Sequence, residues 1–117
     1  MVADQALTDA EVDRIFQALA DTTRRDIVRR TMLGEATVSR LAQDYAMSFA
    51  AVQKHVAVLE RAGLVTKEVH GRERFVRGNP VMIRHAQALL DSYEEIWQSR
   101  IARLDDLLAS DDTRDDK

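Results

Sequence analysis

Apolar residues near the start of the chain are spaced as on one face of an amphipathic helix. Intervals of three and four residues separate Val12, Ile15, Phe16 and Leu19. Thr8 and Glu11 have the spacing of a capping box, which predicts that this helix begins just after Thr8 and ends near Ala20. A second helix is predicted over residues 22–33, with Asp21 as its N-cap.

A short helix and a longer helix follow, joined by a tight turn. Thr37 is a predicted N-cap for the short helix, which ends in a turn at residues 44–47. Ser48 begins the next helix, over residues 48–62, whose apolar positions form a single stripe. The helix over residues 48–62 carries polar and basic residues on the side away from its apolar stripe. This arrangement is what a helix-turn-helix requires.

The pattern changes to that of a β-hairpin over residues 64–77. β-branched and aromatic residues lie on both sides of a glycine-containing turn at Gly71, and the polar positions are mainly Lys and Arg. Pro80 then suits the first turn of a closing helix. The predicted fold class is therefore mainly α with a small β-hairpin, in the order α-α-α-α-β-β-α of a winged helix-turn-helix.

The closing helix is predicted over residues 81–108, and its apolar stripe is wider than one surface helix on a small domain needs. We therefore expect a dimer formed through the first and last helices. The expected interface residues are Val12, Ile15, Phe16, Leu19, Leu89, Tyr93, Ile96, Trp97, Ile101 and Leu104. Residues 1–109 are expected to form one domain, and the acidic residues 110–117 a disordered tail.

Charge is unevenly distributed along the chain. Residues 1–21 hold five acids and one base, residues 22–84 six acids and twelve bases, and residues 85–117 nine acids and four bases. The overall net charge of −3 thus conceals a basic central segment suited to a polyanion. From charge alone, an ordinary solvated surface is an equally good interpretation.

Composition excludes several classes of protein. With no cysteine, the chain has no disulfide framework, thiolate metal site, thiol redox sensor or cysteine nucleophile. No apolar run approaches the roughly 20 residues needed to span a bilayer, and residues 1–7 lack the pattern of a secretory signal. We therefore expect a cytoplasmic protein.

Several short motifs, together with the order of the elements, carry a family resemblance. They are Leu19–Arg25, Val38–Ala42, Met47–Val52, Lys54–Leu59, Ala62–Val65 and Gly71–Arg72. In these motifs the chain resembles the ArsR/SmtB family of bacterial winged-helix repressors over roughly residues 10–105. The resemblance implies a homodimer that binds DNA and represses transcription.

The metal-sensing positions of that family are substituted in this chain. Thr37-Val38-Ser39 stands where thiophilic-metal sensors of the family have Cys-Val-Cys. Other members ligate metal through an Asp-x-His motif at the start of the last helix and a pair of histidines further along. Here the last helix has only His85, followed by Asp91-Ser92-Tyr93. We therefore expect no metal site and no cofactor. Any small-molecule effector stays unidentified.

The fourth helix is the expected DNA-reading element. Gln53 suits a bidentate pair with adenine, Lys54 a guanine or a phosphate, and Phe49 or Ala51 a thymine methyl. A solvated face is the alternative for Gln53 and Lys54, and packing on a neighbouring helix is as good an interpretation of Phe49. The expected contacts from this helix are Ser48, Phe49, Ala50, Ala51, Gln53, Lys54 and His55, where His55 is equally well explained as a structural histidine.

The hairpin and the third helix are expected to add backbone contacts. Arg72 beside Gly71 suits a minor groove. Phosphates are expected beside Lys67, His70, Arg74 and Arg77. Ser39 and Arg40, near the start of the third helix, are equally well explained as DNA contacts or as plain surface.

The sequence thus favours a homodimeric repressor that binds an inverted-repeat operator, and three other classes have less support. An enzyme is disfavoured because no constellation of catalytic residues stands out, and the adjacent acids at residues 94–95 and 105–106 point in different directions on a helix. A winged-helix module for protein contacts and a DNA-binding activator stay open. Tyr93 and Trp97 fit a core or dimer interface better than a ligand pocket.

Overall fold

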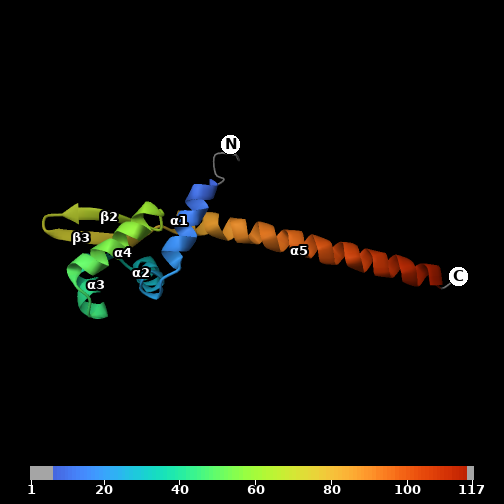
Figure 1. Cartoon of the computed structure of the whole chain (residues 1–117), viewed down its shortest axis with the longest axis horizontal. Coiled ribbons are helices and arrows are strands. Elements are labelled where there is room, and N and C mark those ends of the chain that lie inside the picture. Colours follow the sequence, from blue (N-terminus) through green and yellow to red (C-terminus); the bar gives the residue numbers. More distant parts are fainter. Residues whose placement is uncertain (1–6, 116–117) are drawn as a thin grey trace. The chain divides into compact units, whose positions relative to one another are not determined.

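The computed structural model describes residues 7–115, which form five helices and three short strands (Figure 1). In chain order the elements are α1 (Asp9–Leu19), α2 (Thr22–Leu33), β1 (Ala36–Thr37), α3 (Val38–Tyr45), α4 (Phe49–Arg61), β2 (Val65–His70), β3 (Glu73–Gly78) and α5 (Pro80–Asp115). Contacts divide the chain into two units, residues 1–86 and residues 87–117. The single domain expected over residues 1–109 stays a prediction.

The predicted helix starts are confirmed by their capping hydrogen bonds. In each of the first four helices the N-cap side chain accepts a hydrogen bond from the backbone N–H three residues further on, and the four caps are Thr8, Asp21, Thr37 and Ser48. Glu11 completes the capping box by accepting from the Thr8 N–H at 2.9 Å. Local side chains thus fix where each helix begins.

The core of the first unit is aliphatic and draws on α1 to α4, β2 and β3, while Ala36 of β1 is partly buried against it. Its fully buried larger side chains are Ile15, Ile27, Val38, Leu41, Val52, Val56, Leu59, Leu64, Val65 and Val76. Val52, Val56 and Leu59 form the predicted stripe of α4. Burial of this stripe leaves the opposite side of α4 facing solvent, which is the side expected to read DNA.

The sheet has one strand that the sequence did not predict. β1 pairs antiparallel with β3, placing Ala36 opposite Val76 and Thr37 opposite Phe75, so the strand order is β1-β3-β2. A two-residue strand has no recognisable period of its own, and it forms here because β3 offers an unpaired edge. The predicted hairpin of β2 and β3 is confirmed, with Gly71 at φ +62° in its turn.

Ala46 ends α3 in the left-handed conformation, with φ 54° and ψ 41°. A β-carbon is strained there, whereas glycine is not. We expect Ala46→Gly to raise the free energy of unfolding by about 1 kcal/mol, after the larger entropy of an unfolded glycine is subtracted. Urea unfolding measures this difference.

Ala20 provides the matched control for this substitution. It is also an exposed C-cap residue, but its φ is −81°, so glycine relieves no strain there. Ala20→Gly is expected to give no gain in stability. An equal gain from both substitutions would contradict the strain at Ala46.

The last helix is longer than the sequence predicted. It was expected to end near Leu108, ahead of a disordered tail over residues 110–117, but α5 continues to Asp115. No Gly or Pro follows Leu108 to stop it. Residues 116–117 lie outside the described part of the chain. No helix among the described residues is both long and apolar enough to cross a membrane.

Candidate nucleic-acid interface

The turn at Ala46 joins α3 to α4 and presents the first turn of α4 to solvent. Ser48, Phe49 and Ala50 are exposed, as is Lys54 one turn further on. Ala50 and Lys54 lie on the side of the helix opposite the buried stripe, whereas Phe49 is exposed at the N-terminal end of the stripe itself. The structure therefore leaves most of the expected DNA contacts of α4 accessible to solvent.

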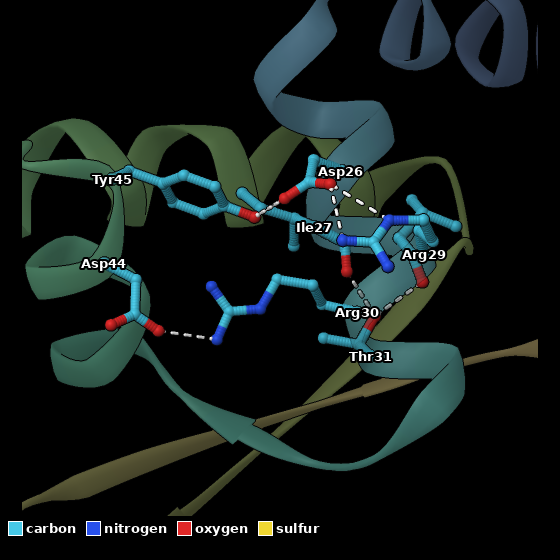
Figure 2. Close-up of polar contacts among 8 residues, drawn as sticks. Asp26, Ile27, Arg29, Arg30, Thr31, Asp44 and Tyr45 are labelled. Atoms are coloured by element: carbon cyan, nitrogen blue, oxygen red, sulfur yellow. Dashed lines mark hydrogen bonds and ion pairs between the residues drawn. The ribbon is translucent and has the colours of Figure 1, made fainter.

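Figure 2 shows a polar cluster that joins α2 to α3 and thereby holds the helix-turn-helix in place. The Tyr45 hydroxyl donates a hydrogen bond to the Asp26 carboxylate at 2.5 Å, and the Arg30 guanidinium donates one to the Asp44 carboxylate at 2.7 Å. The Arg30 guanidinium also lies over the Tyr45 ring, 5.5 Å from its centroid. Arg29 completes the cluster with an ion pair of 2.9 Å to Asp26.

The same cluster makes the protein sensitive to acid. The hydrogen bond from Tyr45, followed by that from Arg29, lowers the pKa of Asp26, and the hydrogen bond from Arg30 lowers the pKa of Asp44. Burial, followed by the hydrogen bond to Asp26, raises the pKa of the Tyr45 hydroxyl. The folded state therefore favours charged carboxylates at both aspartates.

We expect the protein to lose stability as the pH falls below about 4. A carboxyl group with a lowered pKa in the folded state stabilises it above the unfolded pKa, and this contribution disappears as the pH falls through the folded pKa. In Asp26→Asn and Asp44→Asn, the difference between the urea midpoints at pH 7 and pH 3 should shrink. Asp105→Asn, on an exposed part of α5, should keep the parental difference. Equal pH dependence in all three variants and the parent would contradict the assignment.

The surroundings of His55 on α4 favour a structural histidine over a phosphate contact. Its side chain is 19% exposed, and its Nδ1 lies 4.0 Å from the Asp21 carboxylate and 3.5 Å from a nitrogen of Arg24. Arg24 in turn donates to the backbone carbonyls of Ala18 at 2.8 Å and Gln17 at 3.0 Å. His55 thus braces α4 against the corner between α1 and α2.

Gln53 is less accessible than the sequence suggested. It is partly buried, and its Oε1 is buried without a hydrogen-bond partner within the described residues. A bidentate pair with adenine uses both the oxygen and the nitrogen of the amide, so this pairing requires the side chain to rotate. Ala51 is also partly buried, whereas Lys54 points into solvent.

Two bases of the wing, the hairpin of β2 and β3, are turned toward α4 instead of outward. Lys67 Nζ lies 3.8 Å from Glu60, in the last turn of α4. The Arg74 guanidinium lies over the Phe49 ring, 5.6 Å from its centroid. Phe49 was expected to contact thymine or to pack on a neighbouring helix. Its ring contacts a wing arginine and is 42% exposed, so the thymine contact stays a prediction.

The other predicted basic residues differ in how free they are. Arg72 is exposed at the hairpin turn, and no ion pair or hydrogen bond engages it among the described residues. His70 Nε2 lies 3.4 Å from Glu68. Arg77 is paired with Glu35 at 2.7 Å, and Arg40 with Asp44 at 3.3 Å. Ser39 is exposed. The tip of the wing is therefore its freest cationic point.

The residues expected at a dimer interface fall into two groups. In α1, Ile15 is fully buried in the core of its own unit, so the structure corrects its assignment because no surface is left for a partner. Val12 and Leu19 are partly buried, and Phe16 is exposed. In the second unit, exposed apolar side chains follow one side of α5, at Tyr93, Ile96, Trp97 and Leu104, with Leu89 and Ile101 partly buried.

Sequence reasoning missed the contacts that orient the site. Neither the cluster around Tyr45 nor the contact between Arg74 and Phe49 was predicted. Both contacts join residues from elements that are distant in sequence, so no local pattern in the sequence indicates them. Among the described residues, no group of three histidine or acidic side chains gathers as a metal site would require.

Comparison with known proteins identifies the family. A family model described as a helix-turn-helix domain matches residues 14–68, which run from the second half of α1 through most of β2. The HTH-type transcriptional regulator Rv2034 of Mycobacterium tuberculosis is 40% identical over 81 residues, covering 69% of this chain and 76% of that protein.

Solved structures agree on the fold. The crystal structure of an ArsR family transcriptional regulator matches with a TM-score of 0.75 and 35% identity, over 80% of this chain and 97% of the other. An ArsR-like transcriptional regulator from Rhodococcus sp. RHA1 matches with a TM-score of 0.72 and 29% identity, over 81% of this chain and 90% of the other. The chain therefore belongs to the ArsR family of winged helix-turn-helix transcriptional regulators and is itself a DNA-binding regulator of transcription.

Proposed function

We propose that the chain is a homodimeric repressor that binds an inverted-repeat operator. The observation that carries this proposal is the exposed first turn of α4, with the wing beside it. In each subunit, α4 enters the major groove and the wing meets the adjacent minor groove or backbone. Transcription is repressed when the dimer occupies a promoter and excludes polymerase.

Within this proposal the residues divide by accessibility. Ser48, Phe49, Ala50 and Lys54 are exposed and lie against base edges or phosphates without rearrangement. Gln53 turns outward on binding, where its amide hydrogen-bonds a base and leaves its buried, unpartnered position. Ala51 contributes its methyl group. Arg72 enters the minor groove, while Ser39 and the remaining wing bases flank phosphates.

Dimerisation is proposed to cover the exposed apolar side of α5. Trp97 and Leu104 are seven residues apart, so they lie on the same side of the helix, and both are more than half exposed. Exposed side chains of this size in a continuous row favour a partner surface. In the first unit, the exposed Phe16 of α1 is a separate candidate contact with the partner. Two-fold symmetry then places the two recognition helices in successive major grooves, about 34–36 Å apart.

Selection of bound fragments from genomic DNA tests the proposal. We expect enrichment of one inverted repeat, with half-sites about 10 base pairs apart, and affinity that falls steeply with salt. A footprint over the promoter supports repression, whereas a footprint upstream with increased transcription supports an activator. The absence of salt-dependent binding to any duplex would support a module for protein contacts and overturn the proposal.

The proposed role involves no catalysis and no cofactor. The family consists of transcriptional regulators, and no set of side chains described above is arranged for chemistry on a substrate. We place the activity in the cytoplasm, with double-stranded DNA and a second copy of the chain as partners.

A further inference from the structure

Arg74 occupies the junction between the wing and the recognition helix. It lies opposite Val69 in the register of β2 and β3 and on the same side of β3 as the buried Val76. Its guanidinium lies 5.6 Å from the ring centroid of Phe49, the first residue of α4. This distance is within the range of a cation–π contact. A single side chain from the wing therefore contacts the end of α4 expected to meet base edges.

The contacts of Arg74 differ from those of five other arginines of the first unit. Acceptor oxygens engage Arg24, Arg29, Arg30, Arg40 and Arg77. No acceptor oxygen engages Arg74 within the described residues, and the Phe49 ring is its recorded partner. The N–H donors of the Arg74 guanidinium, which no acceptor oxygen engages among the described residues, are therefore available to a phosphate.

We propose that Arg74 is a positioning residue that joins the wing to the recognition helix through Phe49 while donating to a DNA phosphate. This inference rests on the proposed function, because it assigns a role within the same DNA-binding surface. Phe49 sets the direction of the guanidinium, and the guanidinium sets the distance between wing and helix. The wing and α4 then contact the DNA at a fixed distance from each other, which favours DNA sequences that can bind both elements at once.

A double-mutant cycle distinguishes this role from an ordinary phosphate contact. Phe49→Leu removes the ring, and Arg74→Lys keeps the charge but loses the planar group. Affinity for the selected operator and for an unrelated duplex is measured by fluorescence anisotropy across a salt series. We expect the cycle to be non-additive by about two- to fivefold, because either substitution alone already breaks the contact.

The expected pattern has three further parts. The ratio of operator affinity to unrelated-duplex affinity should fall in both single variants. The salt slope should keep its parental value, because no cation is removed. Phe49→Tyr, which retains an aromatic ring, should restore most of the operator preference. Parental urea midpoints in the variants exclude a general loss of folding as the cause.

Arg72→Lys at the wing tip is the matched control. It changes a second wing arginine in the same way, one that is exposed and has no contact with Phe49, so its effect should simply add to that of Phe49→Leu. Additive losses for Arg74→Lys and Phe49→Leu, with intact operator binding by the parent, would overturn this inference alone. A parent that binds no duplex would overturn the proposed function and this inference with it.

Discussion

Charge placed on the exposed side of α5 is expected to separate the dimer and remove operator binding. In the full chain, Trp97→Glu with Leu104→Glu puts two carboxylates on the proposed interface, about two helical turns apart. Burying unpaired charge opposes association, so the protein should sediment as a monomer. Operator affinity should fall by about 10²- to 10⁴-fold, because each subunit then binds its half-site without the second contact.

A control beside the apolar row of the same helix isolates the interface from the added charge. Gln98→Glu introduces a carboxylate at an exposed position next to Trp97, on a side without the apolar row. It should leave both the dimer and the operator affinity near their parental values. A deletion beginning at Tyr93 should act like the double variant. A stable dimer after either change would refute the role of α5.

Gln53→Ala is expected to relax sequence preference without lowering stability. Each lost base contact costs about 1–3 kcal/mol at its own position, so discrimination among bases there should fall by about 10- to 100-fold. Stability should hold, because the Gln53 carbonyl is buried without a partner and its removal breaks no hydrogen bond. Selection of bound sequences with the variant shows which operator position loses its preference.

Arg72→Ala is the comparison for Gln53→Ala, because it should change general affinity and salt dependence instead of sequence preference. Its side chain is exposed at the wing tip, so its loss should weaken binding to most sequences and reduce the salt slope by about one. Unchanged operator selection by Gln53→Ala would remove that residue from the reading set. Unchanged salt dependence in Arg72→Ala would remove the wing tip from the phosphate contacts.

Local signals in the sequence were enough for most of the fold. The N-caps at Thr8, Asp21, Thr37 and Ser48 act through bonds to amides three residues away, so their consequences can be predicted without tertiary contacts. The hairpin was likewise predictable from alternation around Gly71. Strand β1 was not, because two residues extend only where another strand offers hydrogen bonds.

Contacts between elements distant in sequence decide which basic side chains are available to bind DNA. Composition marked Lys67, Arg74 and Arg77 alike as wing bases, yet the fold pairs Lys67 with Glu60, places Arg74 on Phe49 and joins Arg77 to Glu35. Periodicity likewise could not show that Ile15 belongs to the core.

The sequence by itself determined the order of helices, turn and hairpin, and the helix that carries the candidate reading residues. Only the tertiary structure decided which of those side chains reach solvent and which are held by a neighbour. The physical reason is range: capping and periodicity act within a few residues, whereas burial and ion pairing depend on which surfaces the folded chain brings together.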